Sequence, residues 1–166
     1  MPSIHIVSEF KDQIYFITFT IKNWYYIFDR HNRFQILEDS IVYCQKNKNF
    51  KIYAFVFMLN HVHLIASAPD LIGVIRDMKT FLSKEIKKNI IATEPNILKL
   101  FEGNDDNAFW KDGNHPELIH NEKFFKQKIN YIHYNPVRKQ YVHVPEDWYW
   151  SSACKIPTKI IISLIS

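Results

Sequence analysis

Residues 52–67 read IYAFVFMLNHVHLIAS. The stretch holds two runs rich in β-branched and aromatic residues, Ile52–Met58 and His61–Ser67, with Leu59-Asn60 between them. Two such runs joined by two residues predict a β-hairpin.

The second strand of this hairpin carries an unusual pair of polar residues. Alternate residues of a strand face the same side, so His61 and His63 should project from one face while Val62 and Leu64 enter the opposite layer. Two imidazoles one strand step apart can bind a divalent metal. The plainer alternative is two half-buried histidines that hydrogen-bond locally. A histidine-triad hydrolase would need a third alternating histidine, and position 65 is isoleucine.

Periodicity predicts further elements around the hairpin. They are strands over Ile14–Ile21 and Glu117–Ile119, a helix from an Asn32 cap to about Lys46, and helices over Leu71–Lys88 and Glu122–Asn135. Pro136 should end the last helix, because proline pushes the preceding residue out of the helical region. The stretch from Asn89 to Asn114 should be mostly irregular. Helices mixed with hairpin-linked strands predict an α+β fold with an antiparallel sheet.

The last predicted helix carries a second candidate constellation. Tyr131 and Asn135 are one turn apart and share a face, which Gln127 extends. A phenol beside a carboxamide can supply a nucleophile and a neutral oxygen ligand for a metal. Tyrosine is a weak nucleophile at its ordinary pKa of about 10, so it needs a nearby cation or base. The alternative is an amphipathic tyrosine whose ring packs and whose hydroxyl meets water.

Composition limits the class of protein. The chain has 166 residues, 47% of them hydrophobic, a formal net charge of +4 and a pI of about 8.9. We expect a single domain over residues 1–166, with its core at about 14–153 and an apolar tail at 154–166. Two cysteines and no signal-peptide pattern favour the cytoplasm, and no apolar run is long enough to span a membrane.

Three blocks of the sequence together resemble a known family. The block YAFVFMLNHVHLI at 53–65 resembles the HUH block of the insertion-sequence-200-like transposases. The block YIHYNPVR at 131–138 resembles the tyrosine block of the REP-associated tyrosine transposases in that superfamily, and PEDWYWSSA at 145–153 resembles the tail that follows it. The blocks stand in the family's order and spacing.

The resemblance implies a fold, a reaction and a cofactor. It implies a ferredoxin-like antiparallel sheet with helices packed on one face. By position, His61 and His63 correspond to metal ligands, Asn135 to a third ligand and Tyr131 to the nucleophile. The enzyme would be a single-tyrosine transposase that cleaves and rejoins single-stranded DNA near hairpins through a 5′-phosphotyrosine intermediate. Its cofactor would be Mg²⁺ or Mn²⁺.

A groove for single-stranded DNA needs cations and stacking surfaces. The candidates for DNA binding are Lys126, Lys128, Arg138, Lys139 and Trp110, with Trp148 and Trp150 as further stacking candidates. The sequence departs from the family at Leu59, where proline is usual, and at Lys139-Gln140, where small residues are usual. The first departure should alter a turn without loss of chemistry, and the second could change DNA contacts.

Two rival functions and two assemblies stay open. The chain could be a domesticated, catalytically silent protein that binds single-stranded DNA hairpins. It could also be a metal phosphoesterase that uses water and forms no covalent adduct. As an enzyme it could act as a monomer or as a homodimer.

Overall fold

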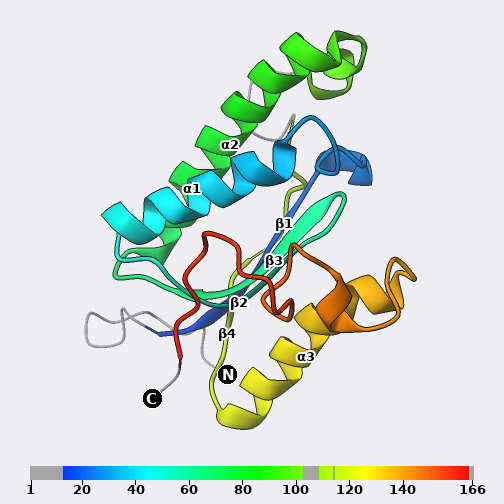
Figure 1. Ribbon diagram of the computed structural model, residues 1–166. Helices are drawn as coiled ribbons and strands as arrows, with labels where there is room; N and C mark the ends of the chain where they lie inside the picture. The colour runs from blue at the N-terminus through cyan, green and yellow to red at the C-terminus, as the bar shows by residue number, and fades with distance from the viewer. Residues whose placement is uncertain (1–12, 103–108, 114, 165–166) are drawn as a thin grey trace.

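The computed structural model describes residues 13–102, 109–113 and 115–164. A four-stranded sheet runs through the molecule in the order β2-β3-β1-β4, and every neighbouring pair is antiparallel (Figure 1). The strands are β1 (Tyr15–Thr20), β2 (Lys51–Phe57), β3 (His61–Ser67) and β4 (Glu117–Leu118). The α+β antiparallel fold expected from the sequence is confirmed.

The predicted hairpin is formed by β2 and β3. The Met58 amide donates to the His61 carbonyl at 2.8 Å, which closes the turn at Leu59-Asn60. The Leu59 carbonyl accepts the amides of Ile27 and Phe28, both at 3.1 Å. This turn therefore anchors the loop that follows β1. Leu59, at the position where the family usually has proline, supplies the carbonyl that does so.

Two helices cover one face of the sheet. They are α1 (Arg33–Asn47) and α2 (Leu71–Thr93), and they pack over the main core (Figure 1). The Asp70 carboxylate caps α2 by accepting the Gly73 amide at 3.1 Å. Val62 and Leu64 face this core, as strand alternation predicts.

The third helix, α3 (Glu122–Arg138), packs on the opposite face of the sheet (Figure 1). Its Ile132 is fully buried in a second apolar cluster with Phe16, Val56 and Ile65 of the strands. The expectation that the helices share one face holds for α1 and α2 and is wrong for α3. The physical reason is that β1 and β3 carry apolar side chains on both faces, so both faces need cover.

Several element boundaries differ from those expected. Helix α2 continues beyond Lys88 to Thr93, and a 3-10 segment, η3 (Pro95–Phe101), follows it in the stretch expected to be irregular. Asn32 stands before α1 with a left-handed backbone (φ 62°), and its side chain makes no capping hydrogen bond. Two shorter 3-10 segments are η2 (Lys22–Trp24) and η5 (Pro145–Asp147).

Pro136 lies inside α3 and does not end it. A proline in a helix removes one hydrogen bond to the carbonyl four residues earlier. In the last turn this loss is small, and the Lys139 amide still donates to the Asn135 carbonyl at 3.1 Å. The helix therefore passes through the proline and ends at Arg138.

The chain after α3 returns to the free edge of β2. Ser151 pairs with Val56, and the Phe57 amide donates to the Trp150 carbonyl at 2.8 Å. Farther on, Ile162 pairs with Ile52, while Ile160 is buried and Ile161 is 72% exposed. The apolar tail is thus partly an added strand. Among the residues that the structure describes, no helix has the length and apolar character to cross a bilayer.

Candidate functional site

The site begins with the two histidines of β3. His61 and His63 project toward α3, and their ring centroids lie 4.7 Å apart. His63 is 5% exposed, packed against the Phe16 ring at 5.2 Å. The two imidazoles are therefore held together under α3, at the end of β3 that borders the hairpin turn.

Neighbouring polar groups fix the His61 tautomer. Asn60 donates from Nδ2 to the Trp24 carbonyl at 3.1 Å, so its Oδ1 faces His61 Nδ1 at 2.7 Å. An amide oxygen can accept but not donate, so Nδ1 of His61 carries the proton and Nε2 carries the lone pair. Thr18 Oγ1 lies 2.9 Å from His63 Nδ1 and can engage that nitrogen in the same way. Nε2 of His61 is then left as a donor to a metal, and so is Nε2 of His63 when the Thr18 hydroxyl accepts from Nδ1.

Burial keeps both histidines neutral. Burial, together with the charge of Lys139, lowers the pKa of His61 to about 4. Burial likewise lowers the pKa of His63 to about 3, assisted by His61, Lys128 and Arg138. Neutral imidazole is the form that binds a metal. The pair is therefore ready to act as a ligand at neutral pH.

Tyr131 lies across from the histidines on α3. Its ring centroid is 5.4 Å from that of His63, and the side chain is 44% exposed. Two cations flank this ring, with Arg138 Cζ at 4.5 Å and Lys128 Nζ at 5.6 Å from the centroid. Positive charge here would stabilise negative charge that develops on the phenolic oxygen. Tyr131 is thus exposed to solvent on one side and close to the histidine pair on the other.

Asn135 lies on the same stripe of α3. It is one turn after Tyr131 and one turn before Lys139. The charge of Lys139 contributes to the lowered pKa of His61. The Asn135 side chain is buried, with 5% exposed. A carboxamide oxygen is a suitable ligand for a divalent cation. Tyr134, by comparison, makes no ring contact with either histidine within the described ranges.

The donor set fits a divalent cation. Two imidazole Nε2 atoms and an amide oxygen form a neutral set that leaves positions open for substrate oxygens. Within residues 13–102, 109–113 and 115–164, no three His, Cys, Asp or Glu side chains gather into a metal cluster. Among the described residues, a third protein ligand would be of another type, and Asn135, one helical turn from Tyr131, has the chemistry.

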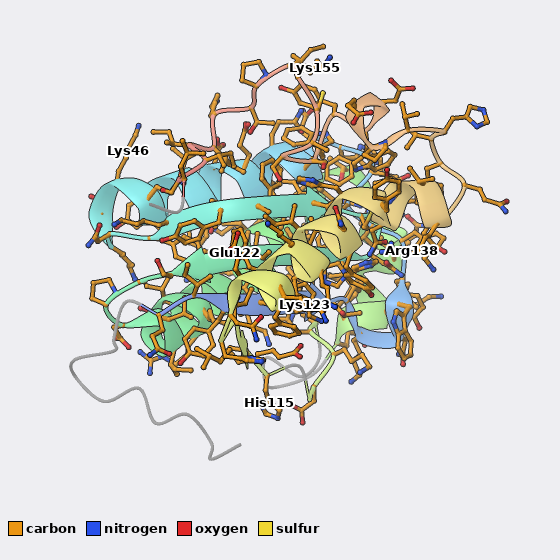
Figure 2. The ribbon with its side chains drawn as sticks, turned by 90° about the horizontal axis from the view of Figure 1, so that it is seen from below. Lys46, His115, Glu122, Lys123, Arg138 and Lys155 are labelled. Carbon is orange, nitrogen blue, oxygen red and sulfur yellow. The ribbon has the colours of Figure 1, made fainter. Side chains whose placement is uncertain are left out.

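The cations expected to bind DNA divide into two groups. Lys128, Arg138 and Lys139 border the Tyr131 and histidine cluster. Lys126 lies farther back on α3 and pairs with Glu122 at 3.0 Å. Figure 2 shows Arg138 at one end of α3 and Glu122 and Lys123 at the other, so the basic end of the helix is the end beside the site.

Trp110 does not offer the stacking surface expected from the sequence. It is 2% exposed, packs against Phe19 and Phe109, and donates from Nε1 to the Lys79 carbonyl at 2.9 Å. Tryptophan combines a large aromatic ring with one N–H donor, so it suits a buried core position as well as a surface that stacks on a nucleotide base. Trp148 and Trp150 are also engaged in packing, the first by a hydrogen bond to the Phe57 carbonyl and the second by stacking on the Phe57 ring.

Three residues of the site were not singled out from the sequence. Asn60 and Thr18 orient the histidines, and Trp24 is a tryptophan whose side chain is 59% exposed beside the hairpin turn. The adjacency of Asn60 to His61 was a usable signal for the first. For Thr18, the signal lies in the strand pairing with His63, which the sequence alone does not give.

Comparisons with known proteins show the family of the chain. The family model described as "Transposase IS200 like" matches residues 9–135. A REP-associated tyrosine transposase of Haemophilus influenzae is 31% identical over 108 residues, which cover 62% of this chain and 58% of that protein's length. A REP-associated tyrosine transposase of Escherichia coli is 26% identical over 78% of this chain and 74% of its own.

A solved structure shows the same fold. It is described as a REP-associated tyrosine transposase bound to a REP hairpin, and it superposes with a TM-score of 0.66 at 20% identity, covering 86% of this chain and 77% of that one. The family match spans well over half of the chain and includes the histidine pair, Tyr131 and Asn135. The chain belongs to the IS200-like transposase family and is similar within it to REP-associated tyrosine transposases.

Proposed function

We propose that this chain cleaves and rejoins single-stranded DNA through a covalent bond to Tyr131. The observation that carries the proposal is the position of Tyr131, whose ring lies 5.4 Å from His63 and is partly exposed. A nucleophile needs access to substrate and a nearby group that holds the phosphate. Tyr131 has access, and the histidine pair with Asn135 could hold a phosphate-binding metal.

Mg²⁺ or Mn²⁺ is the cofactor that this donor set suits. His61, His63 and Asn135 would hold it, and when bound it would polarise a phosphate oxygen and offset the negative charge of the transition state. The protein's own residues prepare the imidazoles for this role. Burial keeps both of them neutral, and Asn60 holds the proton of His61 on Nδ1, which leaves its Nε2 free.

The proposed reaction conserves the energy of the phosphodiester bond. The phenolic oxygen of Tyr131 loses its proton to solvent and forms a bond to the phosphorus. The bond from phosphorus to the 3′-oxygen breaks, and that oxygen takes up a proton from solvent. The products are a 5′-phosphotyrosine and a free 3′-hydroxyl, and attack by the 3′-hydroxyl of another strand reverses the step and joins two ends.

A DNA hairpin with single-stranded flanks is the substrate class we propose. One solved relative is described as bound to a REP hairpin, and the basic end of α3 in this chain places Arg138, Lys139 and Lys128 beside the site. One chain carries all four candidate residues of the centre, which supports a monomer as the active form.

The nucleophile is tested with two matched variants. The purified protein is incubated with Mn²⁺ and hairpin oligonucleotides taken from the flanks of its own gene, and adducts are resolved on a denaturing gel. Tyr131→Phe removes one oxygen and little volume, so it should fold and bind DNA but form no adduct. Tyr134→Phe is the control and should keep most of the activity, since Tyr134 contacts neither histidine.

The other outcomes identify the rival functions. Mass spectrometry that locates the nucleotide on Tyr134 would refute the assignment of Tyr131. Cleavage without any adduct would show a hydrolase that uses water. Tight hairpin binding without cleavage, in Mg²⁺ and in Mn²⁺, would show a catalytically silent DNA-binding protein.

A further inference from the structure

Trp24 occupies an unusual position for a tryptophan. It ends η2, directly after β1, and its side chain is 59% exposed. Tryptophan is the residue with the largest apolar surface, and in most folds that surface is largely buried. The core beneath this loop takes Ile21, Ile27 and Phe28 and leaves Trp24 outside.

The backbone at this position is strained. Asn23 and Trp24 have φ values of 57° and 55°, in the left-handed region that bulky residues rarely adopt. Two hydrogen bonds hold the strained segment, from the Trp24 amide to the Ile21 carbonyl at 2.9 Å and from Asn60 Nδ2 to the Trp24 carbonyl at 3.1 Å. The indole gains no burial in return, so packing does not explain why a tryptophan stands here.

A cation adjoins the exposed indole. Lys111 Nζ lies 5.3 Å from the centroid of the Trp24 ring, and the Lys111 amide is anchored to the Thr20 carbonyl at 2.7 Å. Lys111 also lines a surface cavity of about 320 Å³ with the cations Arg76 and Lys79, and the rest of the lining includes Asp112 and apolar side chains such as Ile72. An exposed aromatic surface next to fixed positive charge is the pairing that single-stranded nucleic acid requires.

This surface is tied to the candidate metal site through one residue. The Asn60 side chain donates to the Trp24 carbonyl and accepts from His61 Nδ1. The segment that presents the indole and the ring that would bind the metal are thus fixed by the same carboxamide. The Trp24 segment therefore borders the candidate metal site.

We infer that Trp24 and Lys111 form a subsite for one unpaired nucleotide next to the scissile phosphate. The base stacks on the exposed indole, and the ammonium of Lys111 neutralises the adjoining phosphate. The ligand class is an unpaired nucleotide of the single-stranded flank, whatever its base, because every base has a face that can stack. This inference rests on the proposed function, since it presumes that single-stranded DNA enters the site.

The test uses a fluorescent base in the unpaired flank. A set of hairpin oligonucleotides carries 2-aminopurine at successive unpaired positions, and stacking on an indole quenches its fluorescence. The wild-type protein should quench one position near the cleavage site. Trp24→Ala should lose that quenching and bind the flanked hairpin about 10-fold more weakly, with unchanged affinity for the same hairpin without its flank. Trp24→Phe should keep most of the affinity, since a stacking ring remains.

Tyr43→Ala is the matched control. Tyr43 is 60% exposed on α1, on the far face of the sheet from the histidines, so its loss should change neither binding nor quenching. The subsite is refuted if Trp24→Ala binds like the wild type, or if it weakens binding to both hairpins equally. Failure of the proposed function looks different, because the wild-type protein itself would then bind no hairpin or form no adduct at Tyr131.

Discussion

Asn60 shows how a single carboxamide can set the chemistry of a neighbouring histidine. Its Nδ2 is committed to the Trp24 carbonyl, which leaves its Oδ1 to accept the proton of His61 Nδ1. Groups that orient a metal ligand from behind often matter nearly as much as the ligand itself. The hydrogen-bond pattern assigns Asn60 this role for His61.

Asn60→Ala should therefore weaken metal binding while sparing the fold. We expect the affinity for Mn²⁺ to fall roughly 10- to 100-fold, because the His61 ring would no longer be held in one orientation and tautomer. Calorimetric titration of the DNA-free protein with Mn²⁺ measures this directly. Asn47→Ala on α1 is the control, since Asn47 binds only a backbone carbonyl of its own helix. Equal Mn²⁺ affinity in the wild type and Asn60→Ala would contradict the assignment.

At the scale of single residues, the sequence predicted which side chains share a face better than it predicted how buried each side chain is. The spacing of His61 and His63 and that of Tyr131 and Asn135 were enough to place each pair on one face of its element. Burial was not accessible in the same way. Trp110 and Trp24 both sit near β1 in space, yet one is 2% and the other 59% exposed, and only the tertiary fold decides which.

An ion pair between buried Arg33 and partly exposed Glu94 joins the start of α1 to the residue that follows α2. Arg33 is fully buried, and its Nη2 lies 2.9 Å from Glu94 Oε2. Arg30 adds a second contact to the same carboxylate at 2.9 Å. Burial lowers the pKa of the Arg33 guanidinium, and Glu94 opposes that shift. The pair fixes the helix layer that supports the back of the sheet.

Loss of this carboxylate should be costly. Glu94→Ala leaves the buried Arg33 without its partner charge, and we expect the free energy of unfolding to fall by about 3 kcal/mol. Urea denaturation measures the change. Glu85→Ala on the same helix is the control, because Glu85 pairs only with exposed Lys88 at 3.2 Å and such pairs contribute less than about 1 kcal/mol. Similar losses of unfolding free energy in the two variants would show that the pair with buried Arg33 contributes no more to stability than an exposed pair.

Element ends were the least predictable part of the fold. A proline predicts the end of a helix through local sterics, but α3 tolerates Pro136 because the proline falls in its last turn. Asn32 is a frequent capping residue, yet here its left-handed backbone directs the chain into α1 without a side-chain cap. The existence and type of each long element followed from periodicity, whereas its end depended on contacts made elsewhere.

The charge of the whole molecule is modest, so its distribution matters more. Figure 2 shows Lys46 far from Arg138, which lies at the end of α3 beside the site. A binding surface concentrated at that end should dominate the response to salt, because each phosphate contact releases counterions.

Affinity for hairpins with single-stranded flanks should fall linearly with the logarithm of the salt concentration and should exceed the affinity for blunt duplex. Lys139→Ala should reduce the slope of that line by about 0.7, as expected for one lost contact to a single strand. Lys46→Ala is the control of equal charge and should leave the slope unchanged. A gel-shift or anisotropy series at several salt concentrations decides this. Equal slopes for Lys139→Ala and the wild type would place the DNA elsewhere.

The tail that follows η5 has a further consequence for the molecule in solution. An unpaired edge strand is a template on which another chain can add by β-augmentation, and natural sheets take measures against it. Within the described residues, the edge of β2 is taken by Trp150, Ser152 and Ser163, and the other edge of the sheet ends in the two-residue β4. The tail thus covers the edge of β2 and removes one template on which another chain could add.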